Sequence, residues 1–283
     1  MKTISLFTLI ALGIIETSHG PFLRPDFGAN HALAAARGNV LLAWSEKNET
    51  GHARVHVALL DSAGRAISPA RELPVLNPSR DAVAPTVTTD GASFIVAWQE
   101  VLGLQQTVAM TLDANGQSAT APQPFGVETV AGDIAPPQLD ALSASVVKTA
   151  APAPGIDTSA PHITQAGSKY AVVWSSTNRI HYRLTNESTR RITTADVDVN
   201  ARPRIDCGMT NCLVVYATRG GGVAGFAFDH TRTDAPVQLQ LASNARDTEV
   251  VMVTNARALI TWYDGEKLLS RSLDLGGKRR ATR

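Results

Sequence analysis

Short apolar runs recur along the chain, and most of them end in an aromatic residue. A typical run extends from Phe94 to Trp98, and a first run beginning at Pro85 and a Gly-containing turn precede it. Two such runs joined by a turn of Gly, Asn, Ser or Asp predict a β-hairpin. Because the second run is apolar at consecutive positions, it predicts a strand buried on both faces. We therefore expect an all-β protein with sheets stacked face to face.

The hairpin pattern occurs five times in one register. Each copy spans fourteen residues, and the copies are 31–44, 85–98, 161–174, 203–216 and 249–262. An aromatic residue ends each copy, and this set includes every tryptophan of the chain: Trp44, Trp98, Trp174, Tyr216 and Trp262. Identical placement after buried runs indicates that these side chains anchor the packing between sheets and do not form a sugar-stacking surface.

A third strand follows each hairpin. In three copies it ends in an Asp-x-x-Gly turn, at 61–64, 113–116 and 274–277, and a fourth stretch follows in most copies. Four-stranded units of about 40 to 50 residues are typical of propeller blades. The repeat predicts a single β-propeller of about five four-stranded blades. Their expected bounds are about 31–80, 85–125, 161–200, 203–245 and 249–283.

One interval between the marker aromatics is longer than the others. Trp98 and Trp174 lie 76 residues apart, whereas the other intervals are 42 to 54 residues. The extra chain, about 126–160, is either a surface insertion into a five-bladed propeller or a degenerate sixth blade. The last copy stops soon after its third strand. Either residues 21–30 complete the last blade, or the chain is a piece of a longer array.

The first twenty residues have the pattern of an export signal. Lys2 precedes an apolar run from Ile4 to Ile15, and a short polar segment ending at Gly20 follows. This pattern predicts a signal peptide over 1–20, with the cleavage position left open. No later segment reaches the roughly twenty apolar residues that a membrane-spanning helix needs. We expect a secreted, periplasmic or cell-surface protein without a transmembrane segment.

Charge and cysteine content restrict the partners. The formal net charge is +1, so no strong field gathers phosphates, and nucleic acid is not an expected partner. Cys207 and Cys212, the only cysteines, flank one hairpin turn. Export to an oxidising compartment predicts a disulfide between them that pins the hairpin register. The seven histidines show no metal spacing, and no metal or other cofactor is expected.

No known catalytic motif is present. The chain has no G-x-S-x-G elbow, no H-E-x-x-H and no phosphate-binding P-loop, and this favours a protein that is not an enzyme. Polar residues follow the marker aromatics at Glu46, Glu100, Arg219 and Asp264. The loops after second strands open on the face where propellers usually bind ligands, so these four are the candidate ligand-face residues. The third and fourth copies lack a carboxylate there, so a ring of carboxylates would be incomplete, and solvated loop charge is the plainer interpretation.

The repeat resembles the β-propeller-like repeats of bacterial secreted and surface lipoproteins, which are mostly of unknown function. The shared frame is Pro-x-Val, Gly, Val-Val-x-Trp and Leu-Asp-x-x-Gly, and it covers about residues 31–283 apart from 126–160. The resemblance implies a fold and a location but no activity.

Three functions remain open from the sequence. The favoured one is a binding module for a glycan or an extracellular protein, acting through loops on a rigid scaffold. The second is a secreted polysaccharide hydrolase or lyase with carboxylates converging at the propeller mouth. The third is an architectural segment of a surface assembly. The sequence leaves the ligand, the oligomeric state and the blade number undetermined.

Overall fold

The computed structural model describes residues 31–125, 129–130, 162–176, 179–184, 190–192, 197–198, 202–232, 236–243, 245–265 and 267–275. The predicted signal peptide and the closing strand expected at 21–30 lie outside these residues. Nearly all of the segment interpreted as an insertion or a degenerate blade also lies outside them. All of the regular elements among the described residues are β-strands. No helix in this part of the chain is long and apolar enough to cross a membrane.

The strands form five antiparallel sheets, which we number as blades 1 to 5 in chain order. Blade 1 contains β1 (His31–Ala36), β2 (Asn39–Lys47), β3 (Ala53–Leu60) and β4 (Arg71–Glu72). Blade 2 contains β5 (Asp81–Thr89), β6 (Phe94–Leu102), β7 (Leu104–Leu112), β8 (Gln123–Pro124) and β9 (Thr129–Val130), which pairs with β7. Blade 3 contains β10 (His162–Ala166), β11 (Lys169–Ser176), β12 (Arg179–Leu184) and β13 (Arg190–Ile192). Blade 4 contains β14 (Arg204–Cys207), β15 (Asn211–Ala217), β16 (Val223–Asp229) and β17 (Val237–Ala242). Blade 5 contains β18 (Arg246–Thr254), β19 (Arg257–Tyr263) and β20 (Leu268–Asp274).

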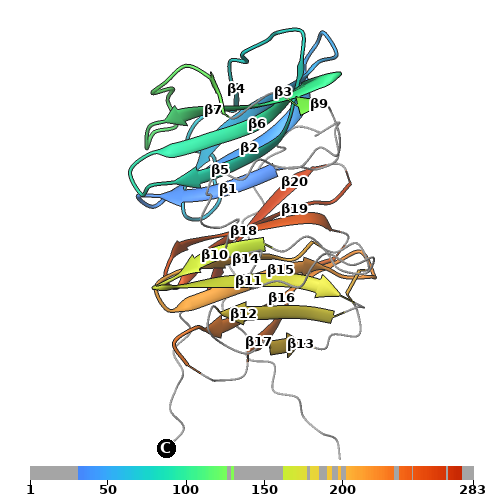
Figure 1. The fold of residues 1–283 in the computed structure, drawn as a ribbon. Helices are drawn as coiled ribbons and strands as arrows, with labels where there is room; N and C mark the ends of the chain where they lie inside the picture. Colours follow the sequence, from blue (N-terminus) through green and yellow to red (C-terminus); the bar gives the residue numbers. More distant parts are fainter. Residues whose placement is uncertain are drawn as a thin grey trace, which may run out of the picture.

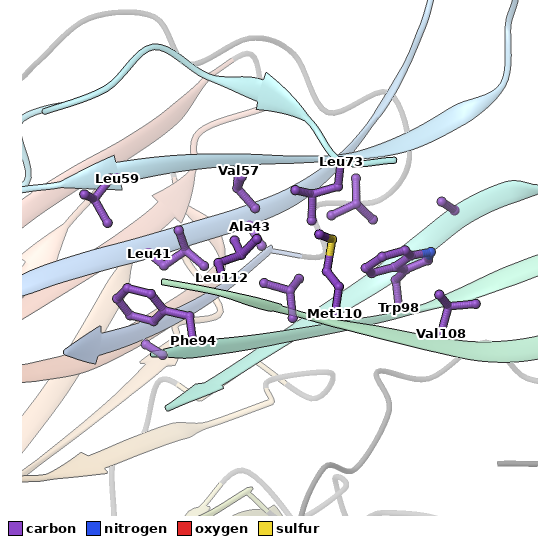
Figure 2. Packing of buried hydrophobic residues seen from close by; sticks show 14 of the residues in the cluster. Leu41, Ala43, Val57, Leu59, Leu73, Phe94, Trp98, Val108, Met110 and Leu112 are labelled. Atoms are coloured by element: carbon purple, nitrogen blue, oxygen red, sulfur yellow. The ribbon is translucent and has the colours of Figure 1, made fainter. Parts of the chain in front are cut away.

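The blades pack face to face through separate apolar clusters. One cluster joins blades 1 and 2, and Figure 2 shows Leu41, Val57, Phe94, Trp98 and Met110 meeting between the two sheets. Further clusters join blades 3 and 4, blades 4 and 5, and blades 5 and 1. The order of neighbours is therefore 3, 4, 5, 1, 2. In Figure 1, β18 to β20 accordingly lie between blade 1 and the strands of blades 3 and 4. The predicted all-β propeller is confirmed.

The marker aromatics anchor this packing in one direction. Trp98 belongs to the cluster shared with blade 1, Trp44 to the cluster shared with blade 5, Trp262 to that shared with blade 4, and Tyr216 to that shared with blade 3. Each of these four aromatics thus packs toward the preceding blade. Trp174 is also buried, and its described partners, Val172 and Ile163, come from its own sheet. The prediction that the marker aromatics anchor packing between sheets is confirmed for Trp44, Trp98, Tyr216 and Trp262.

The two Asp-x-x-Gly turns that lie wholly within the described residues, at 61–64 and 113–116, also contact the preceding blade. The Asp61 Oδ1 accepts hydrogen bonds from the backbone N–H groups of Ala63 and Arg65, at 2.8 and 2.9 Å. Gly64 has φ +83°, a left-handed conformation that favours glycine, and it lies against Leu259 of blade 5. The equivalent Gly116 has φ +74° and lies against blade 1. Blade 1 therefore follows blade 5 in the ring as blade 2 follows blade 1.

The predicted disulfide is present. Cys207 and Cys212 are directly opposed on β14 and β15 and are bonded to each other. Asn255 of blade 5 supports the same hairpin, because its side-chain oxygen accepts the Thr210 N–H at 2.7 Å and its carbonyl accepts the Asn211 amide at 2.9 Å. The hairpin register is thus fixed from both sides.

Candidate functional site

The strand directions define which residues share one end of the ring. The first strands of neighbouring blades contact one another, from β10 through β14, β18 and β1 to β5, and so form the inner side. Because successive strands are antiparallel, the turns between second and third strands lie at the end where the first strands begin. We call this end the leading end, and the candidate site lies there.

Three of the four predicted ligand-face residues lie near turns at the leading end, each on a different blade. Glu46 lies near the end of β2 and accepts a hydrogen bond from the Trp44 indole N–H at 3.1 Å. Arg219 is exposed in the turn between β15 and β16. Asp264 follows β19, and its carboxylate accepts the Lys267 N–H at 2.7 Å. Their role in binding stays a prediction.

The fourth candidate, Glu100, lies inside a strand and not in a loop. It is fully buried within β6, which continues past Trp98. Its carboxylate accepts the backbone N–H groups of Leu76 and Asn77 at 2.6 and 2.9 Å, and the Trp98 indole N–H lies 3.3 Å away. Buried carboxylates need such donors to offset desolvation. Glu100 therefore holds the loop that connects blades 1 and 2, at Leu76 and Asn77, against β6.

Polar side chains of four blades meet on the inner side of the leading end. His31 Nε2 lies 2.6 Å from the Thr261 hydroxyl, and Thr261 is directly opposite Glu249 in the β18–β19 pair. Arg204 Nε donates to Glu249 Oε1 at 2.5 Å. His162 Nδ1 accepts the N–H of Ile205, the residue after Arg204, at 3.3 Å. We name the set His31, Thr261, Glu249, Arg204 and His162 the axial polar chain.

The axial polar chain is close to electrically neutral. Burial and the charge of Arg204 lower the pKa of His162 to about 3, so its imidazole is neutral at physiological pH. Because Nδ1 accepts the Ile205 N–H, the proton is on Nε2, which is a donor. Burial raises the pKa of Glu249, and Asp247 adds to this, while the ion pair with Arg204 opposes it. The site therefore offers hydrogen-bonding groups with compensated charge.

Asp206 holds neighbouring blades together through hydrogen bonds. Its carboxylate accepts the Thr164 hydroxyl from β10 and the Met252 N–H from β18, each at 2.7 Å. Burial raises the pKa of this carboxyl group. The N–H groups on the inner edge of a first strand lack a strand partner, and buried backbone groups of this kind need an acceptor. Asp206 supplies one and so joins blades 3, 4 and 5.

Two first strands contain a bulge opposite the marker aromatic. In β5 the register shifts between Val83 and Thr86, and in β18 it shifts between Arg246 and Glu249. Each bulge contains a non-glycine residue with positive φ, Ala84 at 51° and Asp247 at 44°. Asp visits this conformation more readily than most residues, and bulges reorient side chains at sheet rims and near active sites. The bulge in β18 leaves Asp247 exposed beside Glu249.

The described histidines take part in packing and hydrogen bonding. His56 and His181 stack on the marker aromatics Trp44 and Trp174, with ring centroids 5.8 and 5.5 Å apart. Among the described residues, no three His, Cys, Asp or Glu are grouped closely enough to hold a metal ion. Nothing in the described part of the chain therefore marks a metal centre.

Sequence reasoning missed the axial polar chain. His31 and Glu249 occupy the first position of their copies, and His162 and Arg204 occupy the second. Polar residues at the start of otherwise apolar first strands were the available signal. Proline occupies the first position in the other three copies, so the copies do not share a polar residue at that position.

Comparisons with known proteins support the fold. No family model and no curated protein matches the sequence. A solved protein of unknown function from Dyadobacter fermentans DSM 18053 superposes with a TM-score of 0.60 at 9% identity, covering 87% of this chain and 94% of that one. A GH43_1 enzyme from Xanthomonas citri gives 0.47 at 11% identity, covering 92% and 90%. The catalytic domain of the GH62 α-L-arabinofuranosidase from Coprinopsis cinerea gives 0.44 at 13% identity, covering 91% and 96%. The similarity to the Dyadobacter protein supports the arrangement of sheets, and neither enzyme superposes well enough to indicate a shared active site.

Proposed function

We propose that this propeller is an exported carbohydrate-binding module whose glycan ligand contacts the axial polar chain. The observation that carries the proposal is the meeting of Arg204, Glu249 and His162 from three blades at the inner side of the leading end. Binding sites are commonly formed by a few convergent polar groups held on a rigid scaffold. The disulfide and the predicted signal peptide are compatible with export.

Compensated charge supports a neutral ligand. The charges of Arg204 and Glu249 compensate each other, and His162 is uncharged. The axial polar chain therefore has no net charge that would attract a phosphate or a cation. Planar guanidinium, carboxylate and imidazole groups instead provide donors and acceptors for hydroxyl groups. A neutral glycan fits this chemistry. Arg219 and Asp264, in turns at the same end, are then candidate rim contacts.

One observation favours a second candidate function, the hydrolysis of polysaccharide. Two carboxyl groups lie two residues apart on β18, and their environments differ. Burial raises the pKa of Glu249, and the negative charge of Asp247 raises it further. Asp247 itself is exposed on the bulge. Carboxyl groups with divergent environments are the pattern of an acid and base pair. In this case Glu249 is the proton donor to the glycosidic oxygen, and Asp247 is the base.

Glycan-array binding with the full chain tests the first proposal. Hits are then measured by isothermal titration calorimetry with wild type, Arg204→Met, Glu249→Gln and Arg65→Met. Arg65 lies in an exposed turn at the opposite end of the ring, so it is the matched control. We expect a neutral glycan to bind, with affinity at least tenfold lower in the two axial variants and unchanged in the control. Equal affinity in all four proteins, or binding of protein ligands alone, would overturn the proposal.

Product analysis decides between binding and hydrolysis. Polysaccharides related to the array hits are incubated with wild type, Asp247→Asn and Glu249→Gln, and reducing ends are counted. Cleavage that both substitutions abolish, while Asp247→Asn still binds the glycan, establishes the hydrolase. Binding without any release of reducing ends by wild type leaves the binding module as the function.

A further inference from the structure

We propose a second ligand site, on blade 4, that takes one neutral sugar unit. A pocket of about 310 Å³ opens on the third and fourth strands of this blade. Its lining includes Tyr216, Thr218, Ala224, Gly225, Gln238 and Gln240. It belongs to different strands from the axial polar chain and does not depend on the function proposed for that chain.

The pocket exists because blade 4 departs from the repeat at two paired positions. In every blade the marker aromatic is directly opposite one residue of the third strand. The pairs are Trp44 with His56, Trp98 with Val108, Trp174 with His181, Trp262 with Leu269, and Tyr216 with Ala224. Four blades thus combine an indole with a larger partner, whereas blade 4 combines a phenol with a methyl group. The space left by these smaller side chains is the pocket.

The backbone beside this space is tightly packed. At Gly225, an added Cβ would clash with the Val214 carbonyl, and at Gly222 it would lie 2.7 Å from the Ala242 carbonyl. Neither position therefore has room for a side chain that could fill the space. The Thr218 turn is also closed, since the Gly222 N–H donates to the Thr218 hydroxyl at 2.9 Å. The space stays open to a ligand.

The lining indicates the ligand class. Tyr216, Thr218 and Ala224 are buried and form the floor, whereas Gln238 and Gln240 are exposed and form the rim. None of the lining residues is charged. Tyr216 remains a buried packing residue and contributes an apolar floor, while the Thr218 hydroxyl and the Gln238 and Gln240 amides suit the hydroxyl groups of a neutral sugar. The volume is at the lower end of the roughly 300–1,000 Å³ typical of small-molecule sites, which fits one monosaccharide unit.

The test fills the pocket with the side chain that another blade carries. Ala224→Leu reproduces the Leu269 position of blade 5. Backbone NMR titrations with D-glucose, D-galactose and D-xylose, and with D-glucuronate as a charged comparison, are recorded for wild type, Ala224→Leu and Glu249→Gln. We expect at least one neutral sugar to shift blade 4 resonances saturably in wild type and Glu249→Gln. The affinity should fall at least tenfold in Ala224→Leu, and glucuronate should bind more weakly.

A second variant keeps the test decisive if Ala224→Leu perturbs the fold. Gln240→Leu changes an exposed rim residue and retains the β16–β17 pairing, and it should weaken the same sugar at least threefold. Two results would overturn the proposal: no neutral sugar shifts blade 4 resonances at about 100 mM, or the affinity is equal in wild type and both blade 4 variants. Because Glu249→Gln leaves this pocket intact, failure here and failure at the axial polar chain are distinguishable.

Discussion

The Arg204 guanidinium and the Glu249 carboxylate lie 2.5 Å apart and join the first strands of blades 4 and 5. Both side chains are mostly buried, at 21% and 16% exposure. A pair of this kind holds two strands that no backbone hydrogen bond connects, because β14 and β18 belong to different sheets. It is therefore part of the scaffold as well as of the candidate site.

Replacing Arg204 with Met should destabilise the protein. The substitution leaves the Glu249 carboxylate buried without its counter-charge, and breaking buried pairs costs about 3–5 kcal/mol. Because this pair keeps some solvent contact, we expect a loss of about 2–3 kcal/mol in the free energy of unfolding, measured by urea denaturation at pH 7. Arg65→Met removes an exposed pair with Asp61 and should cost under about 1 kcal/mol. Equal losses in the two variants would show that the axial pair contributes no more than a surface contact.

The neutrality of His162 predicts a pH dependence of stability. Its pKa is about 3 in the folded protein, against an ordinary value of 6.5. Between these values the unfolded chain binds a proton that the folded protein does not, so stability is lost as the pH falls from about 6.5 toward 3. His162→Asn cannot titrate and retains an acceptor for the Ile205 N–H. We expect the stability advantage of wild type over this variant to shrink by about 3 kcal/mol between pH 7 and pH 4, measured by urea denaturation.

The exposed His52 provides the control for this measurement. His52→Asn makes the same substitution at a histidine whose side chain is 43% exposed, so it controls for the loss of an imidazole outside the buried cluster. The carboxyl groups with raised pKa values, Asp206 and Glu249, act in the opposite direction and are present in all three proteins. A pH-independent difference between wild type and His162→Asn would contradict the buried neutral state of His162.

Glu100 and Glu46 form a second matched comparison. Both follow a marker tryptophan by two residues, but Glu100 also accepts two backbone N–H groups from the connection between blades 1 and 2. Glu100→Gln places an amide N–H₂ against those donors and should lower the free energy of unfolding by about 1–3 kcal/mol, whereas Glu46→Gln should cost under about 1 kcal/mol. Thermal and urea unfolding measure both. Similar values for the two variants would show that the Glu100 contacts are not what holds the connection.

Repeat periodicity predicted the features that depend on local sequence. The marker aromatics, the Asp61 turn and the Cys207–Cys212 bridge follow from residues a few positions apart, and the structure confirms each of them. The second-strand runs were apolar on both faces because neighbouring blades cover both faces. Local propensity and packing agree at these positions, and such agreement makes them predictable.

Contacts between blades were not predictable from the same pattern. Arg204 and Glu249 lie 45 residues apart in the chain and meet next to a bulge in β18, which a gapless alignment of the copies does not reveal. Glu100 was expected at a loop because the strand was expected to end at Trp98, whereas β6 continues to Leu102. The blade 4 pocket requires the cross-strand register of Tyr216 and Ala224, which sequence spacing alone did not supply.

Two equivalent turn glycines test the packing of blade 1 against blade 5. Gly64 and Gly116 both have positive φ, so alanine at either site should cost about 1–2 kcal/mol from backbone strain alone. At Gly64 an added Cβ would also lie 2.8 Å from Leu259 and 2.9 Å from Ser270 of blade 5, whereas at Gly116 its nearest neighbour, Leu41, is 3.6 Å away. Gly64→Ala should therefore cost about 1–3 kcal/mol more than Gly116→Ala in urea denaturation. The excess measures how tightly blade 1 is packed against blade 5. If the two variants lose the same free energy, the contact between these blades is looser than the interface between blades 1 and 2.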